Sequence, residues 1–326
     1  MYESIKNFNK QFEYEPEISG KINLKKFKQF IVCGMGGSHL AVDILMSYDP
    51  ALDLVIHNDY GLPFIAKEDI KKTLMIFSSY SGNTEEVVDS FQAAIKKKLP
   101  ATAISIGGKL LELAKKHRVP YIQMPDTKIQ PRMALGFSLR ALLKIIGQIK
   151  ALKESAILVH SLNPAIYEDA GKNLAEKFKG KNPVIYASRR NFSIAYNWKI
   201  KFNETGKIPA FCNVFPELNH NEMTGFDVKE GTRGLSDKFY FIIIKDGDDH
   251  PKIVKRMKVL SELYRKRGLP VEIISLSEDK PRFFKIFSAL VLADWITYYT
   301  AKQYGVEPEQ VPMVEEFKKS ILEPII

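Results

Sequence analysis

Two short polar segments of this 326-residue chain combine residue types that bind anions. The first, residues 33–38, has the sequence Cys-Gly-Met-Gly-Gly-Ser and lies between an apolar run and a helical pattern. Glycines let the backbone approach a ligand closely, and the positive end of a following helix favours an anion. A tight strand-to-helix turn would use the same residues. A dinucleotide fingerprint is poorly matched, because Ala41 occupies its last glycine position and no suitable acidic residue follows the second predicted strand.

The second segment, residues 78–86, places hydroxyl groups along a turn that opens a helix. A single hydroxyl is enough to cap a helix, so three of them beside free amide groups indicate a metal-free phosphate cradle. In an open parallel sheet the ligand lies beyond the carboxyl ends of the strands, so both segments are expected at one edge. The predicted phosphate-binding residues are Gly36, Gly37, Ser38, Ser79, Ser81 and Thr84.

Alternating strands and helices position these segments in the first half of the chain. Apolar runs predict strands, and amphipathic patterns between them predict helices. Such alternation implies right-handed crossovers and a parallel sheet. The predicted strands are 29–33, 52–57, 73–78, 101–106 and 119–123, and the helices after the third, fourth and fifth strands are 84–98, 110–117 and 134–150.

The second half repeats this rhythm, which suggests an internal duplication. We place the boundary in the charged helical stretch 152–181, giving an N-terminal domain 1–152 and a C-terminal domain 153–326. The expected fold class is α/β, with two domains that each contain a mostly parallel sheet flanked by helices. The predicted strands are 183–187, 209–215, 239–245 and 271–276, and the helices are 193–203, 250–267, 281–304 and 312–322.

Composition excludes several classes of protein. Two cysteines, Cys33 and Cys212, cannot build a disulfide framework or a four-thiolate zinc site, and no histidine pair has metal-ligand spacing. No apolar run reaches the length of a membrane helix, and the N-terminus lacks a secretory apolar region, so we expect a cytoplasmic protein. The net charge of +10 is compatible with small anionic substrates, whereas no basic run of five or more residues supports nucleic-acid or membrane binding.

The two polar segments together resemble the sugar isomerase (SIS) domain, a phosphosugar-binding α/β unit. Further motifs, in the same order, are similar to those of the bifunctional phosphoglucose/phosphomannose isomerases of archaea and some bacteria. The resemblance extends from about residue 30 to residue 319. These motifs are Pro-Arg-Met-Ala at 131–134, Phe-Asn-Glu-Thr-Gly-Lys at 202–207, Pro-Glu-Leu-Asn-His-Asn at 216–221, Val-Pro at 311–312 and Phe-Lys at 317–318.

The resemblance implies a metal-free and cofactor-free homodimer that interconverts glucose 6-phosphate and mannose 6-phosphate with fructose 6-phosphate. Glu204 matches the base that carries a proton between C1 and C2 through a cis-enediol. Arg132 matches an arginine that stabilises the enediolate. His220 and Lys318 match the ring-opening residues, and the family's histidine reaches the neighbouring subunit's site.

Each of these residues also has a plain structural alternative. Glu204 could face solvent on a helix, His220 could be an ordinary loop residue, Lys318 could be a surface lysine, and Arg132 could pair with Asp126.

The chain departs from the family pattern at three positions, none of which removes a proposed catalytic group. Val311 stands where threonine is frequent, close to the C1–C2 end of the substrate, and bears on how the two epimers are accommodated. His39 replaces a small residue, and Asn219 replaces a histidine.

Two alternative functions come from other classes. A phosphosugar sensor would need a helix-turn-helix segment, and the roughly 25 residues before Gln29 are too few and too poorly patterned for one. An amidating aminosugar isomerase would need an N-terminal cysteine, which Met1-Tyr2-Glu3 does not provide. An aminosugar-phosphate isomerase or deaminase without that glutaminase half stays open.

Overall fold

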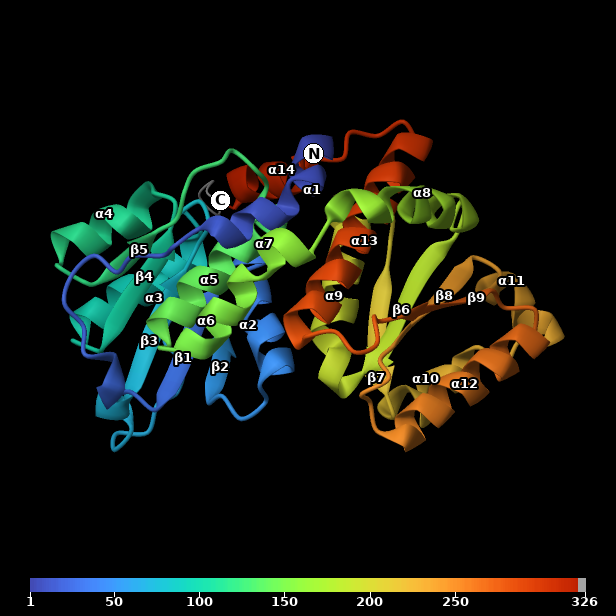
Figure 1. Ribbon diagram of the computed structural model, residues 1–326, viewed down its shortest axis with the longest axis horizontal. Helices are drawn as coiled ribbons and strands as arrows, with labels where there is room; N and C mark the ends of the chain where they lie inside the picture. The colour runs from blue at the N-terminus through green and yellow to red at the C-terminus, as the bar shows by residue number, and fades with distance from the viewer. Residues whose placement is uncertain (322–326) are drawn as a thin grey trace. The chain divides into compact units, whose positions relative to one another are not determined.

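A computed structural model describes residues 1–321, which form two compact units (Figure 1). The N-terminal unit contains residues 3–164 and 279–288, and the C-terminal unit contains residues 1–2, 165–278 and those from 289 onward. Each unit is built around one parallel sheet, which confirms the predicted α/β class with two mostly parallel sheets. Leu322, the predicted end of the last helix, lies outside the described residues.

The N-terminal sheet has the strand order β2-β1-β3-β4-β5, and every neighbouring pair is parallel. The order reverses between β1 and β3, and ligands of open α/β sheets bind at the carboxyl end of such a switch point. Every residue of β3 is buried, which explains its uninterrupted apolar sequence. The strands are β1 (Gln29–Gly34), β2 (Leu54–His57), β3 (Thr73–Ser78), β4 (Ala101–Ser105) and β5 (Tyr121–Gln123).

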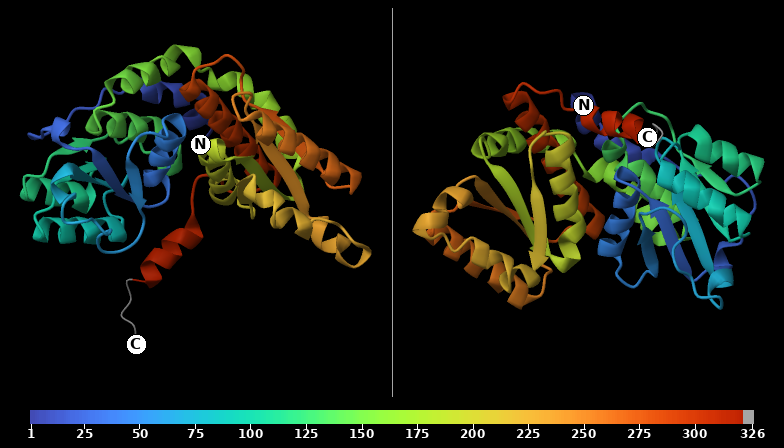
Figure 2. Two further views of the ribbon diagram at one scale, coloured as in Figure 1. Left: turned by 90° about the horizontal axis from the view of Figure 1, so that it is seen from below. Right: turned by 180° about the vertical axis from the view of Figure 1, so that it is seen from behind.

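Helices cover both faces of this sheet (Figures 1 and 2). On one face, Phe91 and Leu110 from two helices pack with strand residues such as Met75 and Phe77 in a fully buried cluster. The single helix predicted over 134–150 was wrong, because Gly147 adopts a φ of +75° and separates two helices. The helices of this unit are α2 (Gly37–Tyr48), α3 (Glu85–Lys96), α4 (Gly108–Lys116), α5 (Leu135–Ile145), α6 (Ile149–Ala156) and α7 (Leu158–Ser161).

The C-terminal sheet has the order β7-β6-β8-β9 and is also parallel throughout. Its order reverses between β6 and β8, so it has a switch point of its own. Tyr186 and Phe241 of this sheet pack with Leu260 and Tyr264 of a covering helix. The strands are β6 (Asn182–Ser188), β7 (Phe211–Phe215), β8 (Phe239–Lys245) and β9 (Val271–Ser275).

Figure 1 labels the helices of the C-terminal unit, and two of the four predicted catalytic residues, Glu204 and Lys318, lie on them. Two further helices, α1 (Tyr2–Lys6) and α13 (Arg282–Gln303), contribute residues to both units. Within residues 1–321, no helix has both the length and the apolar character required to span a bilayer. The helices of this unit are α8 (Glu168–Lys177), α9 (Phe192–Glu204), α10 (Glu222–Gly225), α11 (Arg233–Ser236), α12 (Pro251–Lys266) and α14 (Pro312–Ser320).

Candidate functional site

The glycine-rich loop after β1 lies at the switch point and contacts a segment from far along the chain. A Cβ atom added to Gly37 would lie 2.9 Å from the carbonyl carbon of Pro131 and 3.1 Å from the backbone nitrogen of Arg132. Because Gly37 has no side chain, the short 3₁₀ helix η4 (Pro131–Met133) can lie directly against this loop. This contact brings Arg132, which is only 2% exposed, beside the predicted phosphate loop.

The hydroxyl groups of Ser38 and Ser79 hold the two loops in place. Ser38 Oγ accepts a hydrogen bond from the backbone nitrogen of Tyr80 at 3.0 Å, which joins the loop after β1 to the loop after β3. Ser79 is fully buried, and its Oγ accepts from the backbone nitrogen of Gly82 at 3.0 Å and lies 2.8 Å from Thr84 Oγ1. Both serines therefore shape the turn from inside.

Ser81 differs from these two serines because it is exposed at the tip of the same loop. Among residues 1–321, its Oγ accepts a single, local hydrogen bond, from the backbone nitrogen of Asn83 at 3.2 Å. Thr84 is the N-cap residue of α3, and no hydrogen bond to the helix backbone is made by its hydroxyl. The loop thus presents an exposed hydroxyl at the positive end of a helix, where an anion is stabilised.

A second pair of glycines fixes this loop against the loop that follows β4. Gly82 has a φ of +75°, and a Cβ atom there would lie 1.9 Å from the carbonyl oxygen of Gly107. The backbone nitrogen of Leu110 donates to the carbonyl oxygen of Gly82 at 2.9 Å, and that of Lys109 donates to Asn83 Oδ1 at 3.0 Å. The predicted strand 101–106 stops just before Gly107, and no role was predicted for this glycine. Its role in this close backbone contact was missed, since the partner loop is distant in sequence.

Glu204, the predicted base, is the last residue of α9 in the C-terminal unit and is half-buried. The helix end is tight: a Cβ atom at Gly206 would lie 2.9 Å from the carbonyl oxygen of Phe202. One turn before Glu204, Lys201 forms a fully buried ion pair with Asp294 of α13. These contacts hold the backbone of Glu204 on a rigid element.

His220 and Lys318 lie on two other elements of the same unit. His220 follows the 3₁₀ helix η7 (Glu217–Asn219) and is exposed, with its backbone nitrogen bound to the carbonyl oxygen of Glu217 at 2.9 Å. Lys318 is exposed on α14 and forms an ion pair with Glu315 at 2.8 Å. The structure therefore gathers the predicted phosphate ligands and Arg132 in the N-terminal unit, and places the other three predicted catalytic residues in the C-terminal unit.

Neither cysteine is suited to thiolate chemistry. Burial raises the pKa of Cys33 to about 12, and burial is also the main cause that raises the pKa of Cys212 to about 11. Both thiols therefore stay protonated near neutral pH. Within residues 1–321, no group of three or more histidine, cysteine, aspartate or glutamate side chains is arranged to hold a metal ion.

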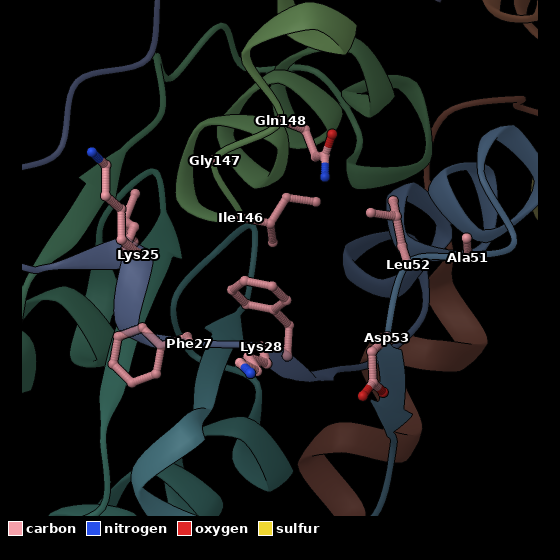
Figure 3. A pocket seen from close by; sticks show the side chains of 11 residues that line it. Lys25, Phe27, Lys28, Ala51, Leu52, Asp53, Ile146, Gly147 and Gln148 are labelled. Carbon is pink, nitrogen blue, oxygen red and sulfur yellow. The ribbon is translucent and has the colours of Figure 1, made fainter.

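A cavity of about 380 Å³ opens at the opposite edge of the N-terminal sheet (Figure 3). Its walls include Phe30 at the start of β1, Asp53 just before β2, and Ile146 after α5. Ligands of parallel sheets bind beyond the carboxyl ends of the strands, whereas this cavity lies at the amino ends. We therefore assign the candidate site to the loops at the switch point and not to the cavity.

Comparisons with known proteins identify the fold and the family of the chain. The family model described as "Bacterial phospho-glucose isomerase C-terminal SIS domain" matches residues 167–321. Among solved structures, a hypothetical protein of Thermus thermophilus superposes with a TM-score of 0.67 at 16% identity, covering 98% of this chain and 87% of that one. A glucosamine-6-phosphate deaminase of Thermotoga maritima gives 0.64 at 17% identity, covering 95% and 97%. At these identities the structural matches establish the fold alone.

Proteins that are similar in sequence identify the family more specifically than the structural matches do. A bifunctional phosphoglucose/phosphomannose isomerase of Caldicellulosiruptor bescii is 32% identical over 99% of both chains, and one of Aquifex aeolicus is 30% identical over 98% of both. A D-glucosamine-6-phosphate 4-epimerase of Sulfolobus acidocaldarius is 28% identical over 72% of this chain and 74% of its own. Given the near-complete coverage at 30% identity and above, the chain belongs to the family of bifunctional phosphoglucose/phosphomannose isomerases.

Proposed function

We propose that this protein is an aldose–ketose isomerase that interconverts glucose 6-phosphate and mannose 6-phosphate with fructose 6-phosphate. The observation that carries the proposal is the braced hydroxyl-and-amide loop at the β1–β3 switch point, with a buried arginine beside it. The family to which the chain belongs supports the same substrates. The reaction needs no added cofactor, because a proton moves within one substrate molecule.

The N-terminal unit binds the phosphate group in this proposal. Ser81 and the backbone amides around Gly36, Gly37 and Thr84 contact the phosphate oxygens, and the positive end of α3 adds to the attraction. Ser38 and Ser79 act mainly through the loop geometry that they stabilise, since their hydroxyls already bond to backbone nitrogens. A rigid cradle of this kind places the sugar carbons in a defined position.

The C-terminal unit supplies the acid–base groups. His220 and Lys318 open the pyranose ring by moving a proton between the C1 hydroxyl and the ring oxygen. Glu204 removes the proton from C2 of the aldose, and the electron pair forms the cis-enediol while the carbonyl oxygen takes on negative charge. The proton of the C2 hydroxyl then passes to the negatively charged O1, and the same carboxyl returns its proton to C1, which yields the ketose. Arg132 stabilises the negative oxygen and, as a guanidinium, does not itself give up a proton.

The decisive experiment is Glu204→Gln, which keeps the size of the side chain and removes the base. We expect turnover of fructose 6-phosphate to fall by about 10²–10⁴-fold, the usual contribution of general acid–base catalysis. Glu262→Gln, at an exposed position on α12, is the matched control and keeps full activity. If Glu204→Gln turned over at nearly the rate of the unaltered enzyme, the proposed mechanism would be wrong.

The proposal includes a homodimer in which His220 acts in the site of the neighbouring subunit. The exposure of its imidazole supports this arrangement. Mixing inactive Glu204→Gln and His220→Ala chains under exchange conditions then produces hybrids with one intact site, so that activity returns to about a quarter of normal in a symmetric dimer. If His220 served its own chain, the mixed chains would stay inactive.

A second candidate substrate class is the aminosugar phosphates, favoured by the relative named D-glucosamine-6-phosphate 4-epimerase. Incubation with glucosamine 6-phosphate, followed by ammonia detection and product analysis, separates deamination and epimerisation from the proposed reaction. Release of ammonia at a rate comparable with hexose phosphate turnover would favour the aminosugar function.

A further inference from the structure

Lys207 lies three residues after Glu204, in a backbone conformation that is unusual for its residue type. Its φ is +57°, in the left-handed region that favours glycine, and it follows Gly206 at the tight end of α9. A non-glycine residue in this region costs about 1 kcal/mol and is retained where the surroundings impose it. The sequence motif 202–207 contains this lysine, yet the proposed mechanism gives it no task.

The ammonium group of Lys207 joins two backbone segments that are about one hundred residues apart in sequence. Its Nζ donates to the carbonyl oxygen of Glu204 at 2.5 Å and also to the carbonyl oxygen of Gln310. The first acceptor belongs to the last turn of α9, where the helix dipole favours a cation. The second acceptor immediately precedes Val311, the N-cap residue of α14.

Glu307 adds local hydrogen bonds within the same segment. Its carboxylate accepts hydrogen bonds from the backbone nitrogens of Glu309 at 2.9 Å and Gln310 at 2.5 Å. Desolvation alone would raise the pKa of Glu307, but these two donors and the nearby charges of Lys207 and Met1 lower it. The backbone of Gln310, between α13 and α14, is therefore held through both its carbonyl oxygen and its amide nitrogen.

This anchoring matters because α14 itself has few contacts. All residues from 312 to 321 are exposed, including Met313 at 80% and Phe317 at 63%. A helix of nine residues is marginal in water unless something else orients it. The orientation of α14 is therefore set by the segment that Lys207 holds.

We propose that Lys207 is a positioning residue of the isomerase, which fixes the end of α9 carrying Glu204 relative to Val311 and the α14 helix that carries Lys318. This inference rests on the proposed function for its catalytic consequence. The ammonium does not contact substrate. It sets the distance between the Glu204 carboxylate and the segment that carries Val311, near the C1–C2 end of the substrate, and Lys318, the ring-opening residue.

The test compares Lys207→Met, which keeps most of the side-chain length, with Lys207→Arg, whose guanidinium can donate to both carbonyl oxygens. The matched control is Lys98→Met, because Lys98 is exposed and has a φ of +54° in a loop of the N-terminal unit. We expect Lys207→Met to lower kcat about tenfold to a hundredfold, since small misplacements of catalytic groups have effects of this size. Its KM changes less than about twofold, its ratio of mannose 6-phosphate to glucose 6-phosphate turnover shifts, and Lys207→Arg recovers most of kcat.

A second measurement is independent of activity. Hydrogen–deuterium exchange of residues 305–314 should accelerate at least about fivefold in Lys207→Met and remain unchanged in Lys98→Met. Unchanged exchange in Lys207→Met overturns the anchoring role. Faster exchange with unchanged kcat and epimer ratio overturns the positioning role. If the unaltered protein did not isomerise hexose phosphates but exchange still accelerated, the anchoring would stand while the proposed function and this catalytic role would both fall.

Discussion

The two sheets have the same strand order around their switch points, yet the loops beyond those points carry different groups: hydroxyls and amides in one sheet, and buried carboxylates in the other. At the β1–β3 switch point the loops offer hydroxyls, backbone amides and glycines. At the β6–β8 switch point a buried polar cluster contains Ser188, Asn191, Asp246 and Asp249. Ser188 Oγ donates to Asp249 Oδ1 at 2.7 Å, and Asn191 Nδ2 lies 3.2 Å from the same oxygen and 3.4 Å from Asp246 Oδ2.

The acidic cluster is unsuited to holding a phosphate dianion. Burial, followed by the neighbouring charge of Asp246, raises the pKa of Asp249, although hydrogen bonds from Ser188 and Asn191 oppose the shift. A bound phosphate would add electrostatic repulsion to the Asp249 carboxylate, which is already desolvated. Two similar halves therefore need not carry two similar sites, because the ligand is chosen by the loop residues and the strand order decides only where the ligand can lie.

The largest expected difference between the two switch points concerns their glycines. Gly82→Ala would place a methyl group 1.9 Å from the carbonyl oxygen of Gly107 at a φ of +75°, so we expect a loss of about 3 kcal/mol in the free energy of unfolding. Gly247, in the loop after β8, is the matched position, because the nearest atom to its added Cβ is 3.8 Å away. Denaturant unfolding of both alanine variants measures the contrast. Equal losses would contradict the role of the packed loops.

A smaller effect is expected at the buried serine of the acidic cluster. Ser188→Ala removes the donor to Asp249 and the acceptor for the backbone nitrogen of Asn191, and should cost about 1–3 kcal/mol. Substrate binding should be unaffected, because no phosphate is held there. Thermal unfolding together with KM for fructose 6-phosphate checks both parts. A several-fold rise in KM with unchanged stability would mean that this cluster belongs to the substrate site.

Ser81→Ala, at the first switch point, is expected to weaken substrate binding while leaving stability nearly unchanged. The hydroxyl is exposed and its only described acceptor contact is local, so the free energy of unfolding should change by less than about 0.5 kcal/mol. The loss of one hydrogen bond to phosphate should raise KM by about two- to tenfold. Steady-state kinetics and thermal unfolding measure the two quantities. An unchanged KM would remove Ser81 from the phosphate cradle.

The smallest expected effect is a pH dependence in the acidic cluster. The folded-state pKa of Asp249 lies above its ordinary value of 3.8, so the folded protein binds this proton more tightly than the unfolded chain. Relative to Asp249→Asn, the unaltered protein should therefore gain stability as the pH falls through this raised pKa, and the gain should level off below 3.8. Differences in Tm between the two proteins, measured from neutral pH to about pH 4, give the sign. If the difference in Tm did not change with pH, or if the unaltered protein lost stability relative to Asp249→Asn as the pH fell, burial would not destabilise the charged form of Asp249.

Sequence reasoning succeeded where one physical signal dominates. The strands predicted at 73–78 and 239–245 have those bounds in the structure, because buried parallel strands require continuous apolar runs. The prediction of one helix over 134–150 failed, because it included Gly147 in the helix, whereas Gly147 has a φ of +75° and lies between α5 and α6. The placement of Arg132 against Gly37 also required the structure, since about ninety residues separate them in sequence.

The residue types of this protein were therefore enough to predict its α/β class and the family to which it belongs. Hydrophobic periodicity and local turn chemistry are encoded within a few residues, so they can be recognised in a single chain. The tertiary structure alone decided that Ser79 is buried inside its loop, that Gly82 contacts Gly107, and that Lys207 binds the segment before α14. These features depend on close packing between distant segments, and packing at ångström precision is set by the whole fold.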